Sequence, residues 1–255
     1  MEDARETERL ARPVERDDEV WVREDDDGFE EEAVAPTRTT PSRAPRKPKV
    51  PEEVAAELSG KLDAQHRERN LQRLSDAIRA YDRDRYQDAL RMLKAIVDQA
   101  PDVAAARELL GLTLYRLGRW PAAVKELRAY FELTGSYDQH PTLMDAYRAQ
   151  KRWPTVERLW NELKEASPHP AVVAEGRIVM AGALADRGEL RKAIDLLERS
   201  KPVVKNPKDH HLRTMYALAD LYDRAGDIPR ARDLFRRLAE IDPDYFDVRS
   251  RLRGL

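Results

Sequence analysis

The side chains best suited to chemistry in this sequence are its histidines and its clustered acids. Histidine is the commonest general base and, together with carboxylates, a frequent zinc ligand. The five histidines are scattered, at His66, His140, His169, His210 and His211, and we expect them at surface and linker positions. None belongs to a His-Glu-x-x-His motif, and no Gly-rich phosphate loop is present. We therefore expect no enzyme, no cofactor and no metal site.

The densest acidic segment lies near the N-terminus. Residues 1–32 contain 15 Asp and Glu and five Arg, a net charge of −10, whereas residues 36–50 contain five basic residues and no acid. A calcium loop centred on Gly28 is excluded, because its first and last ligands would be Arg23 and Val34. Charge blocks with so little apolar periodicity bury too little surface to offset the entropy of ordering. Residues 1–51 are therefore predicted to be a disordered tail, acidic and then rich in Pro and Arg.

Trp21 and Phe29 are large apolar residues within this acidic segment. In one interpretation they are isolated apolar residues in a solvated tail. In the other they form a short linear motif, anchored by Trp21, that docks on a partner or on the folded part of this chain.

Composition also bears on the compartment. The chain has no cysteine, no apolar run approaching the ~18 residues of a membrane span, and a charged N-terminus. These features predict a cytoplasmic protein that does not enter a membrane. The predominance of Arg over Lys is typical of a GC-rich bacterial genome.

From about residue 52 onward, apolar residues recur at spacings of three and four, which predicts helices. Five segments then align with one another: DRYQDALRML, GRWPAAVKEL, KRWPTVERLW, GELRKAIDLL and GDIPRARDLF. Their third residues are Tyr86, Trp120, Trp153, Leu190 and Ile228, separated by 33 to 38 residues. A period of this length with two helices in each unit predicts helical hairpins that stack on their neighbours.

These segments resemble the tetratricopeptide repeat (TPR). The family pattern has a small residue in the first helix, an aromatic residue and then Ala early in the second helix, a large apolar residue, and a closing Pro. The fifth repeat matches through Ala219, Ala231, Phe235 and Pro243, whereas the third has Met144 and Val156 where small residues are usual. The fourth is followed by an unusually long connection, RSKPVVKNPKDHH. The chain is also similar to uncharacterised bacterial TPR proteins with an N-terminal tail.

The resemblance implies an all-α fold, a right-handed superhelical solenoid of about five TPR-like hairpins preceded by the tail. We predict a capping helix over residues 52–69 and the solenoid over 70–255, with a short C-terminal cap. The expected repeats lie near residues 70–103, 104–136, 137–173, 174–211 and 212–245. Trp120, Trp153, Trp160 and Phe235 are expected in the core, and Pro121, Pro154 and Pro229 in the first turns of second helices.

In the TPR family the first helices line a concave groove that binds peptides. Carrying the family's groove positions over to this sequence predicts Leu74, Ile78, Tyr81, Glu108, Leu112, Tyr115, Asp145, Arg148, Arg213, Tyr216 and Asp220. The alternative at the N-terminal end is that a helix within residues 52–68 covers Leu74 and Ile78. Because groove residues lie outside the core, replacing Tyr115 and Arg148 by Ala is expected to cost little stability.

The function implied by the resemblance is a non-catalytic adaptor or scaffold that binds a protein or peptide partner. The alternative is a nucleic-acid-binding or ribosome-associated protein that uses its Arg-rich N-terminal region, including RTTPSRAPRKPKV, for phosphate contacts. The adjacent acidic block and the nearly neutral repeat region oppose that alternative.

Overall fold

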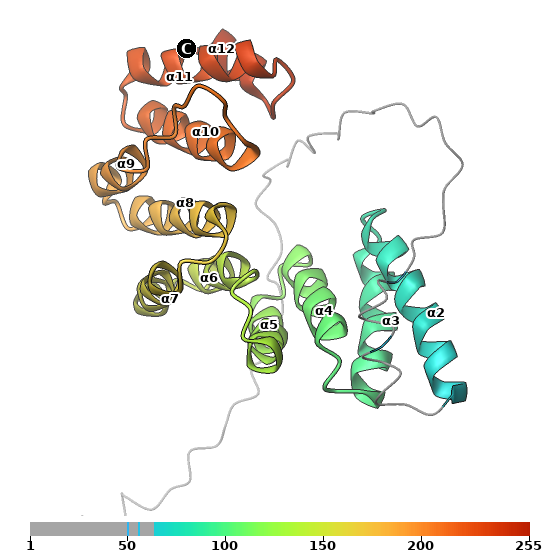
Figure 1. Cartoon of the computed structure of the whole chain (residues 1–255). Coiled ribbons are helices and arrows are strands. Elements are labelled where there is room, and N and C mark those ends of the chain that lie inside the picture. The colour runs from blue at the N-terminus through green and yellow to red at the C-terminus, as the bar shows by residue number, and fades with distance from the viewer. Residues whose placement is uncertain (1–49, 51–55, 57–63) are drawn as a thin grey trace, which may run out of the picture. The chain divides into compact units, whose positions relative to one another are not determined.

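The computed structural model describes residues 50, 56 and 64–255; the predicted tail, apart from residue 50, and most of the predicted capping helix lie outside this part of the chain. The described residues form helices and no strand, as expected for an all-α fold (Figure 1). The helices are α2 (Ala64–Tyr81), α3 (Tyr86–Gln99), α4 (Ala104–Arg116), α5 (Trp120–Thr134), α6 (His140–Ala149), α7 (Trp153–Ala166), α8 (Pro170–Asp186), α9 (Leu190–Glu198), α10 (Asp209–Arg224), α11 (Ile228–Ile241) and α12 (Val248–Gly254). None of these helices is long and apolar enough to cross a membrane.

The helices pair into consecutive hairpins. α2 packs on α3, α4 on α5, α6 on α7, α8 on α9 and α10 on α11, and α12 packs on α11 at the C-terminal end. The second helix of each hairpin also contacts the first helix of the next hairpin. The first helices α4, α6, α8 and α10 contact one another in order (Figure 1). The described residues therefore form a solenoid in which each hairpin is held by its neighbours.

Close approach of the two helices is possible because two columns of the repeat carry small residues in every hairpin except the third. The first-helix column is Ala77, Gly111, Met144, Ala181 and Ala219, and the second-helix column is Ala89, Ala123, Val156, Ala193 and Ala231; all ten are buried. At Gly111 a Cβ atom would stand 2.7 Å from the side chain of Leu127 on the facing helix α5. No side chain larger than hydrogen fits there without a shift of the Leu127 side chain or of α5.

The turn inside each hairpin has one geometry, repeated five times. A residue in the left-handed region (φ between 56° and 80°) precedes each second helix by two positions: Asp84, Gly118, Lys151, Gly188 and Gly226. The amide of the following residue donates to a carbonyl five positions earlier, and this N–O distance is 2.9 Å in all five turns. This bond satisfies a carbonyl at the end of the first helix and ends that helix at the same register in each hairpin.

The predicted helix starts are confirmed at the prolines. Pro121, Pro154 and Pro229 lie in the first turns of α5, α7 and α11. Proline is tolerated there because the first amides of a helix have no carbonyl partner within it.

The expected aromatic core is confirmed at Trp160 (5% exposed) and Phe235 (0%) but not at Trp120 and Trp153, which are only half-buried. Trp120 and Trp153 are the first residues of α5 and α7, so each lies at the end of its hairpin, where neighbouring helices cover only part of the ring. The Trp120 ring instead packs edge-on against Tyr115, with 5.2 Å between ring centroids.

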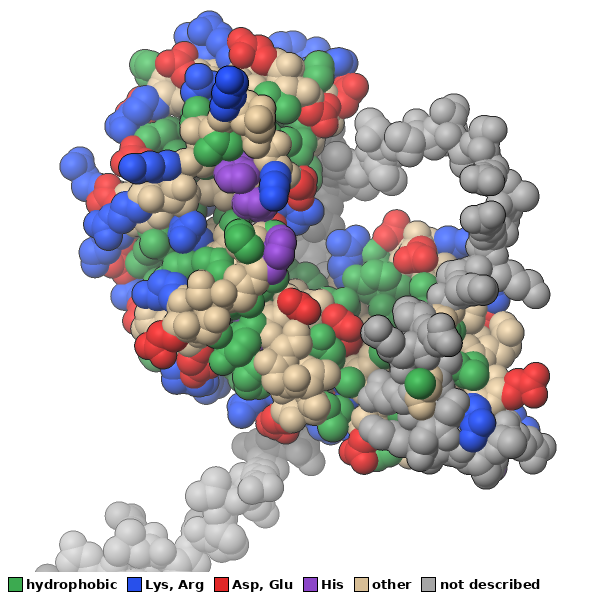
Figure 2. Space-filling model, in the orientation of Figure 1, with side chains coloured by type: hydrophobic (Ala, Val, Ile, Leu, Met, Phe, Trp, Pro, Cys, Tyr) green, Lys and Arg blue, Asp and Glu red, His purple; other side chains and the backbone are tan. Residues whose placement is uncertain are grey.

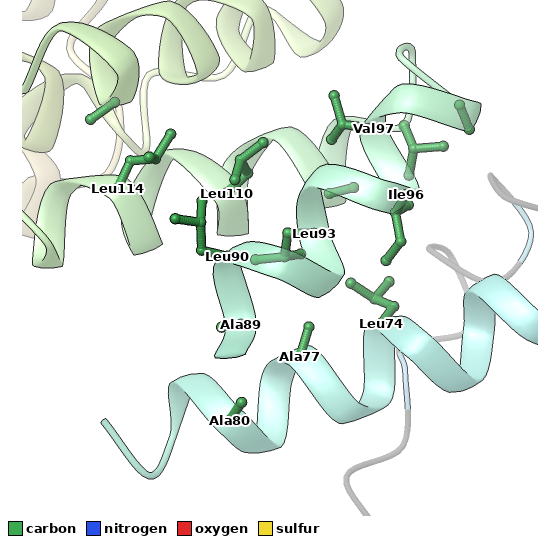
Figure 3. Close-up of a cluster of buried hydrophobic side chains, with 14 residues drawn as sticks. Leu74, Ala77, Ala80, Ala89, Leu90, Leu93, Ile96, Val97, Leu110 and Leu114 are labelled. Atoms are coloured by element: carbon green, nitrogen blue, oxygen red, sulfur yellow. The ribbon is translucent and has the colours of Figure 1, made fainter. Parts of the chain in front are cut away.

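The first hairpin buries the side of α2 that carries Leu74, Ala77 and Ala80 (Figure 3). Leu74 and Ala77 face Leu93 and Ile96 on α3, Ala80 lies nearest Ala89, and Leu74 is only 2% exposed. The prediction that Leu74 lines an open groove is therefore wrong. Leu74 lies three residues before Ala77, so both share the helix face that packs on α3.

The long connection expected after the fourth repeat is present. α9 has nine residues and ends at Glu198, and α10 begins at Asp209. The ten residues between them, RSKPVVKNPK, form no helix or strand.

The repeated turn predicts that introducing a glycine at its left-handed position stabilises the fold and that removing one destabilises it. Replacing Lys151 by Gly should raise the free energy of unfolding by up to about 1 kcal/mol, because an L-residue is strained at positive φ and glycine is not. Replacing Gly188 by Ala should lower it by about 1 kcal/mol, and a Cβ there meets no atom within 4 Å, so the cost is confined to the backbone. Urea unfolding measures both changes.

The matched control is Lys125→Gly, within the helical part of α5. Glycine in a helix interior costs about 1 kcal/mol, so this variant should be destabilised while Lys151→Gly is not. Equal losses in the two Lys→Gly variants would contradict the turn geometry.

Candidate functional site

Two adjoining hollows lie on the layer of first helices. The central hollow, about 630 Å³, is bordered by α4, α6, α8 and the start of α10 and includes Tyr115 and Asp145. The C-terminal hollow, about 420 Å³, lies between α8 and α10 and includes Tyr216 and Phe246. Both hollows are lined by Arg148, Glu175, Ile178 and Arg213. The two hollows are therefore direct neighbours, and we call them together the groove.

The C-terminal hollow combines an apolar lining with charged residues. Ile178 and Ala181 of α8 face Ala217 and Leu221 of α10 across it. The charged residues of the lining are Glu175 of α8, Arg213, Asp220 and Arg224 of α10, and Arg148 of α6. Such a mixture is typical of sites that anchor an apolar side chain and orient it through polar contacts.

Part of the predicted groove lines these hollows and part does not. The hollows include Tyr115, Asp145, Arg148, Arg213, Tyr216 and Asp220. They do not include Leu74, Ile78, Tyr81, Glu108 and Leu112. Ile78 and Tyr81 pack, partly buried, against the same core as Leu74. The groove therefore begins at the C-terminal end of α4. The residues of the first hairpin that were predicted to contact a partner, Leu74, Ile78 and Tyr81, pack against the core instead.

Glu108 is engaged by the neighbouring repeat. Its carboxylate accepts a hydrogen bond of 2.8 Å from the Gln139 side chain, which precedes α6. Burial raises the pKa of Glu108, and the bond from Gln139 lowers it in part. Glu108 thus joins α4 to the start of α6.

A chain of polar contacts joins α4, α6 and α8 across the central hollow. The Tyr115 hydroxyl donates to Asp145 Oδ2 at 2.5 Å, and Arg148 Nη1 donates to Asp145 Oδ1 at 3.1 Å. Arg148 Nε then donates to Asp186 Oδ2 on α8 at 2.6 Å. Burial, and then the hydrogen bond to Asp145, raise the pKa of Tyr115. Tyr115 is therefore a neutral donor that holds two repeats together.

A second set of contacts continues toward the C-terminus. Arg213 Nη1 of α10 donates to Glu175 Oε1 of α8 at 3.1 Å. Burial raises the pKa of Glu175, and the charge of Arg213 partly opposes that shift. The Tyr216 hydroxyl donates to Asp247, and Asp220 pairs with Arg251 on α12.

These contacts correct the expectation that groove residues can be replaced at little cost. Tyr115 and Arg148 are only half-buried, but both are bonded to other repeats. Removing them leaves Asp145 and Asp186 without their donors. A double Ala variant is therefore a poor probe of binding, because it changes stability as well.

Gly182 is a residue whose role sequence reasoning missed. A Cβ at this position would stand 2.7 Å from Cζ of Arg148, so the guanidinium lies directly against the α8 backbone. Glycine in a helix interior lowers stability by about 1 kcal/mol relative to Ala, so it is uncommon there. A glycine within the predicted helix was therefore the sequence signal for a close contact at this position.

Phe246 was also missed, because it lies beyond the last aligned segment. Its side chain is 69% exposed, borders the C-terminal hollow, and packs near the Tyr216 ring with 5.2 Å between centroids. Its φ of +45° is rare for a bulky L-residue. A strained backbone that displays an aromatic ring at the end of a groove marks a candidate binding residue.

The expectation that the histidines lie on the surface is wrong for His140. His140 is 2% exposed and packs against Phe131 and Tyr137, and burial lowers its pKa. Within residues 64–255, no group of three His, Cys, Asp or Glu side chains could hold a metal ion. Trp21 and Phe29 lie outside the described residues.

Tyr115→Phe tests the link between α4 and α6. Loss of the hydroxyl removes the donor to Asp145 and should lower the free energy of unfolding by about 1–2 kcal/mol. Tyr147→Phe on α6 is the control, because that hydroxyl has no hydrogen-bond partner in the described part of the chain. Chemical denaturation that shows equal changes in the two variants would mean that the Tyr115 bond contributes nothing.

Comparison with known proteins agrees with this geometry. Models of the tetratricopeptide repeat match residues 71–137 and 174–244. Among solved structures, a thermophilic TPR protein from Thermus thermophilus is 22% identical, with a TM-score of 0.57 over 72% of this chain and 97% of that one. A putative kinesin light chain from Podosopora anserina with nearly identical TPR-like repeats is 19% identical, with a TM-score of 0.52 over 69% of this chain and 96% of that one.

No curated protein matches the chain. At these identities the structural likeness shows the fold alone, whereas the family models cover residues in both halves of the solenoid. Together with the repeated hairpin, its small-residue columns and its five identical turns, they identify the family. The chain belongs to the tetratricopeptide repeat family.

Proposed function

We propose that this protein is a non-catalytic adaptor or scaffold that binds a peptide or helix of a partner protein in the groove. TPR repeats are in general protein–protein interaction modules. The observation that carries the proposal is the adjacency of the two hollows, which share Arg148, Glu175, Ile178 and Arg213 in their linings. A ligand that fills both would contact α4, α6, α8 and α10.

The size and lining of the groove support a peptide ligand. Each hollow falls within the range of about 300–1,000 Å³ in which proteins bind compact ligands, and together they accommodate several side chains. The apolar part between α8 and α10 suits an apolar anchor residue, and Tyr216 and Phe246 supply rigid aromatic contacts beside it. Groove recognition of a helix or an extended segment uses this combination.

The state of the polar groups favours binding over catalysis. Asp145 is paired with Arg148 of its own helix, which also binds Asp186 of α8, and Glu175 is paired with Arg213 of the next repeat. Within the described residues, neither carboxylate is hydrogen-bonded to a histidine that could act as a general base for a nucleophile. The arrangement supports a structural role for the groove's charges.

The nucleic-acid alternative gains no support from the groove or from the face shown in Figure 2. Basic and acidic side chains are intermixed on the face shown in Figure 2, and many form ion pairs within the solenoid. Binding to phosphates requires a surface on which cations predominate. The Arg-rich segment on which this alternative depends lies outside the described residues.

Groove binding can be tested by placing a charge in the apolar lining. The Ile178 side chain lines both hollows, so Ile178→Glu introduces a carboxylate into the apolar lining of each. When the full-length variant is used as bait in a cell lysate, it should no longer capture the partners that bind in the groove. Phe246→Ala removes an exposed ring and should weaken the same interactions while changing stability by less than about 0.5 kcal/mol. Affinity capture with quantitative mass spectrometry compares the variants.

Ile241→Glu is the matched control, because Ile241 is 44% exposed on α11 and lines neither hollow. Thermal unfolding of every variant shows whether a loss reflects misfolding. If Ile178→Glu, Phe246→Ala and Ile241→Glu all capture the same proteins, those proteins bind outside the groove.

A further inference from the structure

The connection between α9 and α10 is held at both ends and exposed in the middle. The Ser200 and Lys201 amides donate to the carbonyls of Leu197 and Glu198, and Pro202 is buried. At the other end the Lys208 amide donates to His211 Nδ1 at 3.0 Å. Residues 203–206 between these anchors are exposed. The loop therefore presents its middle residues from a fixed base.

The exposed part carries two adjacent valines. Val203 is 38% exposed and Val204 is 41% exposed, and they are among the few large apolar residues of the described chain with that much exposure. Loops usually present polar side chains to water. An adjacent apolar pair on an exposed loop is a feature that partner surfaces use.

The same loop is strongly basic. It contains Arg199, Lys201, Lys205 and Lys208 and no acid. The acids that flank it are engaged elsewhere, because Glu198 pairs with Arg230 and Asp209 pairs with Arg213. None of the loop's four cations forms an ion pair with another described residue. Its charge is therefore available to an acidic partner.

A hollow of about 300 Å³ adjoins the base of the loop. Its lining includes Ser200 and Pro202 of the loop, His210 and His211 of α10, and Arg177 of α8. Arg177 is half-buried and lies over the Trp160 ring at 5.8 Å from the centroid, but it pairs with no carboxylate among residues 64–255. Burial lowers the pKa of Arg177, and no nearby acid opposes that shift. A carboxylate that entered this hollow would compensate the guanidinium charge.

We propose that the α9–α10 loop and its adjoining hollow form a second docking surface, which binds an acidic, apolar-containing segment of a partner protein. Carboxylates of the partner contact Lys201, Lys205 and Arg177, and an apolar side chain contacts Val203 and Val204. This surface is distinct from the groove, because the residues assigned to contact the partner, Lys201, Val203, Val204, Lys205 and Arg177, line neither groove hollow; only Lys208 and His210 also border the central hollow.

The geometry favours an acidic protein segment over a lipid or nucleic-acid surface. A flat anionic membrane would touch the exposed residues of the loop but would not enter the hollow that Arg177 lines. Single-stranded nucleic acid is usually held by aromatic stacking, and the loop offers no aromatic side chain. A flexible segment with carboxylate side chains reaches both the loop and the hollow.

Fluorescence anisotropy with the full chain tests this assignment. The probe is a labelled short peptide of Glu and Asp with two adjacent Leu at its centre; its comparison peptides have Lys in place of the acids, or Ser in place of Leu. Lys201→Glu with Lys205→Glu should weaken binding of the acidic probe by at least about tenfold. Val203→Ser with Val204→Ser should weaken it by about fivefold, and added salt should weaken it for the unaltered chain.

The control pair is Lys94→Glu with Lys125→Glu, on the exposed sides of α3 and α5, which changes the net charge by the same amount. It should change binding by less than about twofold, because distant exposed charges are screened. Ile178→Glu in the groove should also leave binding unchanged. Three results would each overturn the proposal. The control pair could weaken binding as much as the loop variants, or the Lys peptide could bind as tightly as the acidic probe. Polyuridylate RNA or phosphatidylserine vesicles could also bind more tightly than the acidic probe.

Discussion

The fold depends on the close approach of two helices within each hairpin. Ala, and once Gly, stands at most of the positions where the helices touch, and at Gly111 there is no space for a further carbon atom. In the third hairpin Met144 and Val156 occupy these positions and are also fully buried, and α6 has only ten residues. Buried side chains of the right volume are therefore sufficient there, although small ones are the rule.

The turn that closes each hairpin determines what the first helices present. Because all five first helices end in the same hydrogen-bonded geometry, equivalent positions recur along one side of the stack. From α4 to α12 those positions carry Tyr, Asp, Glu and Arg side chains that bond from repeat to repeat. The groove is thus built by the contacts that hold the repeats in register, and binding and stability are coupled at Tyr115 and Arg148.

Much of this architecture was predictable from the sequence, and the exceptions have physical causes. The aligned segments predicted the hairpins, the buried small residues and the proline helix starts, because each is set by local pattern. The positions of Leu74 and His140 depend on what packs against them, and one repeat's pattern does not contain that information. Phe246 and the packing of Arg148 on Gly182 depend on contacts beyond the aligned segments or between repeats. Whether the groove residues bind a partner remains a prediction.

Hydrogen–deuterium exchange of the full chain with and without a captured partner tests the central claim most directly. A partner in the groove excludes water from the first helices and slows their local opening. The account predicts slower exchange in α4, α6, α8 and α10, with little change in α5, α7 and α11. Slower exchange confined to α5, α7 and α11, with α8 and α10 unaffected, would contradict it.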